Sequence, residues 1–174
     1  YSTDLTVDPR TYDHIKGTGT SPHRLGSVWA AMLWEVTWAL IDSYGFDEDF
    51  IDGNGGNNIV LQLVTEALKL QPCNPGFVDG RDAILAADQA LYDGLHHCLI
   101  WNAFAKRGLG FSADQGSSFI RTDGTEAFDL PTGIPNMCPP LIPTMSQWML
   151  FILGLLMVTM SVVYIGKKAE LSKV

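Results

Sequence analysis

The chain has 174 residues and a formal net charge of −8, from 11 Lys and Arg against 19 Asp and Glu. Phosphate binding needs clusters of basic side chains, and the sequence has none outside its last few residues, so nucleic acid is excluded as a partner. The length suits one domain plus a tail. The chain opens at Tyr1 without an export signal, so we expect a fragment or a processed product.

The three cysteines, Cys73, Cys98 and Cys138, are too few for a disulfide scaffold and include no C-x-x-C pair. In an exported protein Cys73 and Cys98 could form one bridge. The alternative is that both are buried free thiols, since cysteine is often buried as a small hydrophobe. The location inferred below, outside the cell, favours the bridge.

The first predicted helix begins after Ser21, which can cap it, with Pro22 at the first helical position. Apolar residues then recur with the spacing of one buried helix face, at Leu25, Val28, Trp29, Met32, Leu33, Val36, Leu40 and Ile41. Trp34 and Trp38 lie on another side, which indicates that more than one face is covered. Gly45 is a natural stop.

Three more helices are predicted, at about residues 58–70, 79–92 and 96–107. Their inward stripes are Ile59, Leu63, Val64, Ala67 and Leu68, then Ala83, Ile84, Ala87 and Leu91, then Leu99, Ile100, Ala103 and Phe104. No segment alternates convincingly like a strand. We therefore expect an all-α fold, with a compact helical domain over residues 1–111. An irregular extension or linker, rich in Gly, Ser, Asp and Pro, should follow over residues 112–146.

The last segment, residues 147–174, is apolar with a basic end. Residues 148–165 carry no charge, and as a helix they would span about 27 Å, close to the hydrocarbon thickness of a bilayer. Trp148 and Tyr164 bracket the stretch, and Lys167 and Lys168 would keep the C-terminus in the cytoplasm. A buried core helix is the alternative, but such a helix normally has a polar face. We therefore expect one transmembrane helix, with the helical domain outside the cell.

A short motif precedes this apolar stretch, with Ile142, Pro143, Thr144 and Trp148 as its marks. Together with the helix and the basic end, it resembles the IPTL-type C-terminal sorting segments of bacterial exported proteins. Met145 stands where that family usually has Leu. The resemblance implies that sorting machinery recognises the tail, and either removes it or hands it to a surface anchor.

Several strings of the helical domain occur in a specific order, among them S-P-H-R-L-G-S-V-W-A at 21–30, L-K-L-Q-P-C-N-P-G-F at 68–77 and F-A-K-R-G-L-G at 104–110. From about residue 12 to residue 113 the chain resembles the C-terminal helical part of the fungalysins, which are secreted zinc endopeptidases of thermolysin-like architecture. The resemblance implies a C-terminal fragment of an enzyme that cleaves extracellular proteins. It also implies a location outside the cell or on its surface.

The fungalysins bind zinc through H-E-x-x-H on a helix and a Glu in a downstream motif. None of the four histidines, His14, His23, His96 and His97, begins H-E-x-x-H, and the Glu motif has no counterpart. The resemblance therefore implies zinc as a cofactor of the full-length enzyme only, with no metal ligand in this chain. The partners it implies are the missing N-terminal zinc-binding half and a peptide or protein substrate. We expect the chain alone to be inactive.

One catalytic residue, His23, is implied by the same resemblance. Thermolysin-like enzymes place a His from the C-terminal lobe across the cleft from the zinc, where it donates a hydrogen bond to the oxyanion of the tetrahedral intermediate. Its context there, His-x-x-Gly/Ser at a helix start, is matched by His23-Arg24-Leu25-Gly26. Thr18 stands where the thermolysin pattern has an Asp that orients the His. The alternative is an ordinary surface His at a helix start.

Two further groups are weaker candidates. An oxygen-rich loop could bind calcium, but its spacing does not fit an EF-hand, and a solvated acidic loop is the simpler interpretation; its members are Asp47, Glu48, Asp49, Asp52, Asn54, Asn57 and Asn58. His96 and His97 are adjacent, so within one helix they cannot share a face as metal ligands.

Two functions from different classes remain open. The first is the peptidase fragment described above. The second is a membrane-tethered helical binding or structural module, complete without a peptidase half. The reading frame upstream of Tyr1 discriminates between them.

Overall fold

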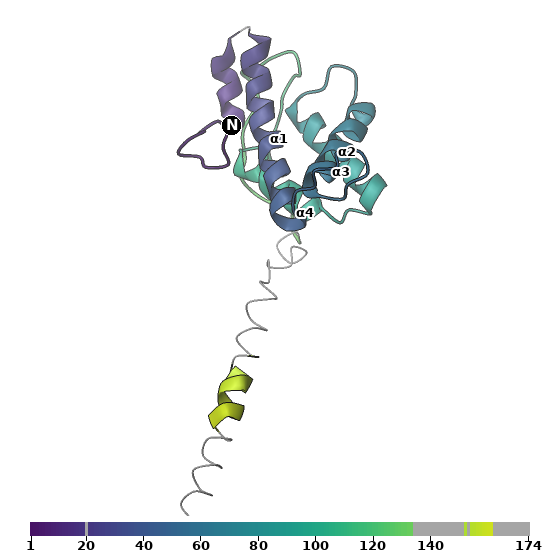
Figure 1. The fold of residues 1–174 in the computed structure, drawn as a ribbon. Coiled ribbons are helices and arrows are strands. Elements are labelled where there is room, and N and C mark those ends of the chain that lie inside the picture. Colours follow the sequence, from purple (N-terminus) through teal and green to yellow (C-terminus); the bar gives the residue numbers. More distant parts are fainter. Residues whose placement is uncertain (20, 134–151, 153, 162–174) are drawn as a thin grey trace, which may run out of the picture. The chain divides into compact units, whose positions relative to one another are not determined.

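The computed structural model describes residues 1–19, 21–133, 152 and 154–161. The chain divides into two compact units, Tyr1–Cys138 and Pro139–Val174. In the first unit (Figure 1), a 3-10 helix precedes four α-helices: η1 (Tyr12–Thr18), α1 (Pro22–Tyr44), α2 (Gly56–Leu70), α3 (Phe77–Tyr92) and α4 (His97–Lys106). The described residues form isolated bridges but no β-strand, so the prediction of an all-α domain is confirmed.

The ends of α1 follow from local sequence signals. The hydroxyl oxygen of Ser21 accepts a hydrogen bond from the Arg24 N–H at 3.4 Å, and Pro22 is the first helical residue. Gly45, with φ 77°, ends the helix in a conformation that favours glycine. The sequence pattern does not reveal η1, because so short a helix shows no apolar period.

The core forms where α1 packs against η1, α2 and α4, and where α3 packs against α2 and α4. Along α1, Val28, Met32, Val36 and Leu40 are buried, as their spacing predicts. The Trp29 ring stacks on Phe104 and meets the edge of Phe77, with centroids 5.8 Å and 5.4 Å apart. Gly80 makes room for this ring, because a Cβ there would lie 2.7 Å from the Trp29 side chain. Aromatic packing at this crossing therefore fixes α1 against α3 and α4.

Two leucines predicted to face inward do not. Leu68 on α2 is 66% exposed and Leu91 on α3 is 45% exposed. Both lie on the outer edge of their apolar stripes, where no described segment covers them. The apolar period shows which face of a helix points inward, but not how much of that face the neighbouring elements cover.

Residues 112–133 pack back onto the helices, within the segment 112–146 that the sequence predicts to be an irregular extension or linker. The Gly110 N–H donates to the Ala127 carbonyl at 2.7 Å, and Asp114 and Thr125 exchange two backbone hydrogen bonds at 3.0 Å and 2.7 Å. Ala113 is buried. The expected domain boundary at residue 111 therefore lies inside the first compact unit. Irregular backbone pairing of this kind has no sequence period, and residues 134–146 lie outside the described residues.

The N-terminal segment is tied to the helices by Arg107, which is fully buried after α4. Its guanidinium contacts the Glu35 carboxylate at 2.6 Å and donates to the carbonyls of Asp8 and Arg10. Lys106 contacts the other Glu35 oxygen at 2.8 Å. From sequence, Lys106 and Arg107 only favour the end of a helix. In the fold they complete a buried ion pair, which is tolerated because its remaining donors are hydrogen-bonded.

In the second unit only residues 152 and 154–161 are described, and they are helical with exposed side chains. Most of the predicted transmembrane stretch, residues 148–165, lies outside the described residues. The same holds for Ile142, Pro143, Thr144 and Trp148 of the predicted sorting motif. No helix within the described ranges has both the length and the hydropathy that crossing a bilayer requires.

Candidate functional site

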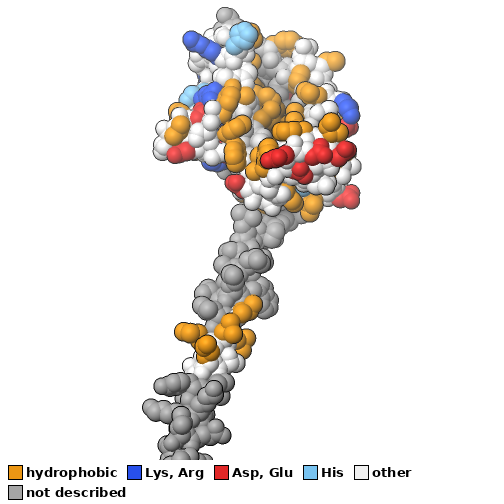
Figure 2. All heavy atoms as spheres, in the orientation of Figure 1, with side chains coloured by type: hydrophobic (Ala, Val, Ile, Leu, Met, Phe, Trp, Pro, Cys, Tyr) orange, Lys and Arg blue, Asp and Glu red, His pale blue; other side chains and the backbone are white. Residues whose placement is uncertain are grey.

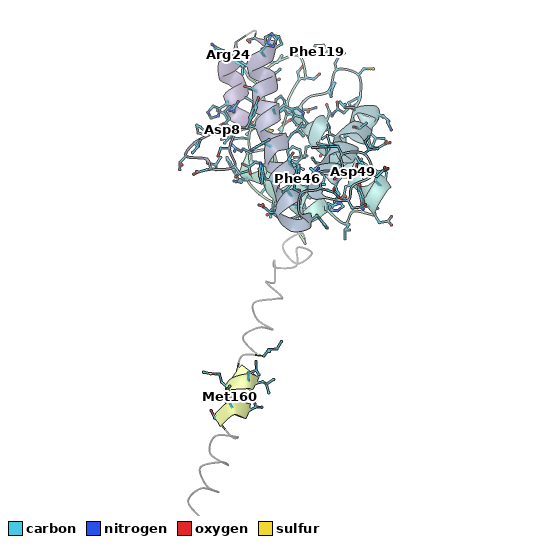
Figure 3. The ribbon with its side chains drawn as sticks, viewed as in Figure 1. Asp8, Arg24, Phe46, Asp49, Phe119 and Met160 are labelled. Atoms are coloured by element: carbon cyan, nitrogen blue, oxygen red, sulfur yellow. The ribbon has the colours of Figure 1, made fainter. Side chains whose placement is uncertain are left out.

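The start of α1 presents His23 to solvent. The Ser21 cap and Pro22 fix the first turn, and His23 follows as the second helical residue, exposed. Its neighbour Arg24 and the apolar Phe119 appear at the same end of the domain (Figure 3). Free backbone N–H groups give a helix N-terminus a partial positive charge, which favours an anionic group. This geometry allows His23 to donate a hydrogen bond to an oxygen that gains negative charge.

No described side chain is hydrogen-bonded to His23. Thr18, at the sequence position of the expected orienting residue, is buried, and its hydroxyl donates to the Ile15 carbonyl at 2.6 Å. The Thr18 hydroxyl therefore stabilises the end of η1 and does not orient the imidazole. Within the described residues, the direction of His23 depends on the backbone that leads into α1.

Arg121 holds that backbone from a distant part of the sequence. Its Nη1 donates to the Gly19 carbonyl at 2.5 Å and lies 3.5 Å from the Ser21 carbonyl. The loop that carries Arg121 is closed by a hydrogen bond from the Ser117 N–H to the Asp123 carboxylate at 2.9 Å. Sequence reasoning missed Arg121, because this loop falls in the segment expected to be a linker.

A cavity of about 300 Å³ lies between this loop and the helices. Tyr12, Ile15 and Phe77 line one side, and Phe119 and Ile120 line the other. The two loop residues are 80% and 52% exposed. The start of α1 therefore has apolar side chains beside it, on a loop that backbone hydrogen bonds hold in place.

Asp88, the buried His96 and the half-buried His97 form a cluster at the C-terminal end of α3. The Asp88 carboxylate, 0% exposed, lies 2.6 Å from Nδ1 of His96 and 2.8 Å from Nδ1 of His97, and it accepts the His96 N–H at 3.0 Å. The rings of Tyr44 and Tyr92 meet the His96 ring edge-on, with centroids 5.1 Å and 4.7 Å away. The cluster joins the end of α3 to the start of α4.

The two histidines do not both belong to one helix, although the sequence pattern predicts that they do. His96 lies before α4, as its cap, and only His97 is helical, so both rings can reach one carboxylate. Burial acts to raise the pKa of Asp88, but hydrogen bonds from His96 and His97 outweigh it and hold the pKa below its usual 3.8. Burial raises the pKa of Tyr44 and Tyr92 nearby. His96 and His97 thus have a structural role in this fold.

In the described part of the chain, no three His, Cys, Asp or Glu side chains are grouped so that they could hold a metal ion. In the oxygen-rich loop between α1 and α2, side chains instead form hydrogen bonds with backbone groups of the same loop. The Asp47 carboxylate accepts the N–H groups of Asp49 and Asn54 at 2.9 Å and 3.1 Å. The side-chain amides of Asn57 and Asn58 donate to carbonyls of the same loop at 2.8 Å and 2.7 Å. Self-capping therefore explains why these residue types gather here.

The predicted bridge between Cys73 and Cys98 is wrong. Cys73 is free and exposed, whereas Cys98 takes part in a disulfide. Cys73 precedes α3 and Cys98 lies in the first turn of α4. The remaining cysteine of the chain, Cys138, lies outside the described residues.

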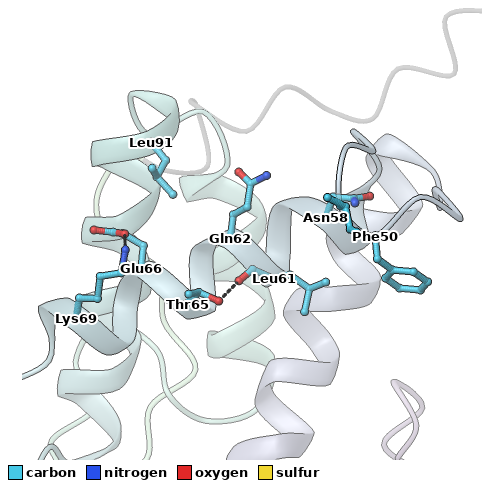
Figure 4. Close-up of a pocket in the computed structure, with 9 residues that line it drawn as sticks. Phe50, Asn58, Leu61, Gln62, Thr65, Glu66, Lys69 and Leu91 are labelled. Atoms are coloured by element: carbon cyan, nitrogen blue, oxygen red, sulfur yellow. Dashed lines mark hydrogen bonds and ion pairs between the residues drawn. The ribbon is translucent and has the colours of Figure 1, made fainter.

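A second hollow, of about 340 Å³, lies over α2 (Figure 4). Phe50 and Leu61 border one part of it, and the ion pair of Glu66 with Lys69 borders another. Its polar groups are engaged with their neighbours, as in the hydrogen bond from the Thr65 hydroxyl to the Leu61 carbonyl at 2.7 Å. In the space-filling view, acidic side chains gather low on the face shown, away from the start of α1 (Figure 2). The residues around the hollow over α2 therefore do not bring hydrogen-bond donors or acidic groups together at one point.

Comparison with known proteins finds that the family model of the Fungalysin metallopeptidase (M36) matches residues 1–113. Extracellular metalloproteinase 2 of Phaeosphaeria nodorum is 45% identical over 142 residues, which cover 77% of this chain and 21% of that protein. The Extracellular metalloproteinase of Pyrenophora tritici-repentis is 42% identical over 144 residues, covering 78% and 21%. Extracellular metalloproteinase MEP of Neosartorya fischeri is 45% identical over 140 residues, covering 77% and 21%.

The chain therefore spans about a fifth of the length of the curated relatives it matches, 21% in each of these cases. These relatives are fungal, so they give no support to the bacterial source that the sorting segment suggests. The matched family segment contains all four helices and His23.

Proposed function

Because this chain belongs to the fungalysin metallopeptidase family, we propose that it is the C-terminal lobe of a secreted zinc metalloendopeptidase that cleaves extracellular proteins. The observation that carries the proposal is His23, exposed at the capped start of α1 within the segment that matches the family. A lobe of this kind contributes a wall of the substrate cleft and one catalytic side chain.

In this proposal His23 supplies an N–H to the oxygen that becomes negatively charged when the peptide carbonyl is attacked. The partial positive charge at the start of α1 favours the same oxygen. Because that negative charge exists only in the transition state and the intermediate, the donor lowers the barrier without tightening substrate binding. Loss of such a donor typically costs about 2.7–4 kcal/mol, or roughly 10²–10³ in kcat.

The residues described here do not fit a zinc site. A catalytic zinc needs three converging His or carboxylate ligands, and no such group occurs in the described part of the chain. We therefore assign no reaction step to a metal held by this chain. The proposal places the ligands in an N-terminal half outside this chain, which is its partner in the complete enzyme, with a polypeptide substrate bound between the two.

We also propose that the tail anchors the protein to a membrane, at least transiently, with the domain outside the cell. Residues 148–165 are uncharged and about as long as a bilayer is thick, and basic residues follow. Sorting machinery would act on the motif at 142–148. Deleting residues 147–174 should release the domain from membranes, and a truncated protein that still partitions into membranes would count against the anchor.

The second candidate is a membrane-tethered helical binding or structural module without catalysis. It is favoured by one observation. In the described residues, no buried side-chain nitrogen or oxygen lacks a hydrogen-bond partner, which is expected of a domain that folds on its own.

The decisive experiment uses the complete coding sequence and the purified complete protein. The peptidase proposal expects an H-E-x-x-H motif upstream, one zinc ion per molecule by metal analysis, and chelator-sensitive hydrolysis of an unfolded protein substrate. The 174-residue chain alone serves as the control and should show neither stoichiometric zinc nor hydrolysis. A reading frame that starts near Tyr1 without that motif would contradict the peptidase and favour the module.

A further inference from the structure

The turn before His23 includes a glycine in a backbone conformation that few other residues adopt. Gly19 has φ 57° and ψ −134°, and it closes η1 immediately before the helix cap. Glycine has more backbone conformations open to it than other residues, so contacts with neighbouring groups decide which one is kept. Since no described side chain is hydrogen-bonded to the imidazole, a loose turn would let His23 point in several directions.

Arg121 bridges this turn. Its Nη1 donates to the Gly19 carbonyl at 2.5 Å and lies 3.5 Å from the Ser21 carbonyl, so one guanidinium reaches the residues on both sides of position 20. A charged donor makes a stronger hydrogen bond to a carbonyl than a neutral one. The planar guanidinium also presents its N–H groups in a fixed geometry, which an ammonium does not.

The loop that carries Arg121 is itself fixed to the core. The Ile120 N–H donates to the Ser117 carbonyl at 2.9 Å, which closes the turn just before Arg121. Gly124 is buried so close to Tyr12 that a Cβ would lie 2.5 Å from the phenol oxygen. Tyr12 in turn opens η1 and is 2% exposed. Arg121 therefore connects a loop that is anchored to the core with the residues that lead into α1.

From this geometry we propose that Arg121 is a positioning residue for His23, an inference that rests on the proposed function above. Arg121 acts by holding Gly19 and Ser21, so that the imidazole leaves α1 in one direction. A displacement of about 1 Å in a reacting group can cost roughly 10²-fold in rate. Because the oxygen is charged only in the transition state, the loss falls on kcat and leaves KM nearly unchanged.

The test uses the complete zinc-loaded protein and steady-state kinetics. We expect Arg121→Ala to lower kcat about tenfold with KM within about twofold, and Arg121→Lys to fall between it and the wild type. Arg24→Ala is the matched control, because it removes the same charge from an exposed neighbour of His23. It should leave both constants unchanged.

A double mutant separates positioning from a general loss of structure. In the His23→Ala background, Arg121→Ala should cause no further loss, because Arg121 acts through the imidazole. An equal loss in that background, or wild-type kcat in a folded Arg121→Ala protein, overturns the positioning role. If thermal unfolding shows that the Ala variant is not folded, Arg121→Lys decides by the same two readings.

The same variants distinguish a failure of the positioning role of Arg121 from a failure of the catalytic role of His23. If His23→Ala lowers kcat while the Arg121 variants do not, only the positioning role fails. If His23→Ala itself retains wild-type turnover, the catalytic role of His23 in the proposed function fails, and the positioning role fails with it.

Discussion

At the scale of single residues, several charges of this domain hold distant segments together. Arg107 joins the N-terminal segment to Glu35 on α1, and Asp88 joins α3 to His96. Arg81 is buried as well, donating to the Gly110 carbonyl and lying over the Trp101 ring at 4.7 Å. Each of these contacts joins residues that belong to different structural elements. A sequence shows the charges but not their partners, which is why these structural roles could not be predicted.

Stability should depend on pH through Asp88. Its pKa in the folded protein is below the usual 3.8, so its stabilising effect is present above that pH and is lost as pH falls through the folded-state pKa. We expect Asp88→Asn to lower the unfolding free energy by about 3 kcal/mol at pH 7. This difference from the wild type should shrink below about pH 4.

Urea unfolding of both proteins between pH 7 and pH 2 checks this expectation. Asp93→Asn, which changes the exposed carboxylate at the end of α3, is the control and should alter stability little. A difference for Asp88→Asn that stays constant down to pH 2 would show that the carboxylate is not held in its charged form by the two histidines.

The cysteines give a second residue-scale prediction. Without reductant, the exposed Cys73 should react with an alkylating reagent, whereas Cys98 should react only after reduction. Mass spectrometry of proteolytic peptides measures both and identifies the peptide joined to Cys98. Alkylation of Cys98 in the unreduced protein would contradict the disulfide.

At the scale of elements, the sequence predicts what is local. The α1 helix has a capping Ser21, a Pro22 at its first position and a terminal Gly45, and each works as expected. The η1 turn and the pairing of residues 110 and 127 depend on contacts between distant segments and were not predicted. The candidate site divides in the same way. His23 is marked by its own motif, whereas Arg121 is linked to it only by the fold.

The contact of the Trp29 ring with the start of α3 gives an element-scale prediction about two glycines. A methyl group at Gly80 would meet the Trp29 ring, which Phe77 and Phe104 hold in place, so Gly80→Ala should destabilise the domain by about 1–3 kcal/mol. Gly26, also helical, has open space at its Cβ position, and Gly26→Ala should stabilise by about 0.5–1 kcal/mol. Thermal unfolding measures both. Equal effects of the two changes would argue against this packing.

At the scale of the whole molecule, the domain extends beyond the last helix. Ala113 is buried, and Ala127 and Leu130 pack against the core, although they follow α4. The family match ends at residue 113, but the compact unit continues to Cys138. The segment after the matched region therefore both completes the core and supplies Arg121.

Two truncations test this boundary. A chain that ends at residue 138 should unfold at the same temperature as the complete chain, because the first unit is intact. A chain that ends at residue 111 loses the contacts of Ala127 and Leu130 and should be less stable by about 2 kcal/mol. Circular dichroism at 222 nm during heating measures both. Equal midpoints would show that residues 112–138 behave as a linker.

The central claim is that His23 stabilises the transition state of peptide hydrolysis. The most direct measurement is the steady-state kinetics of His23→Ala in the complete zinc-loaded protein. His14→Ala is the control, because His14 is also an exposed histidine in the N-terminal part of the chain. We expect unchanged zinc content, a kcat lower by roughly 10²–10³, and little change in KM, while the control keeps wild-type constants. Near-wild-type turnover in a folded, zinc-loaded His23→Ala protein would contradict the claim.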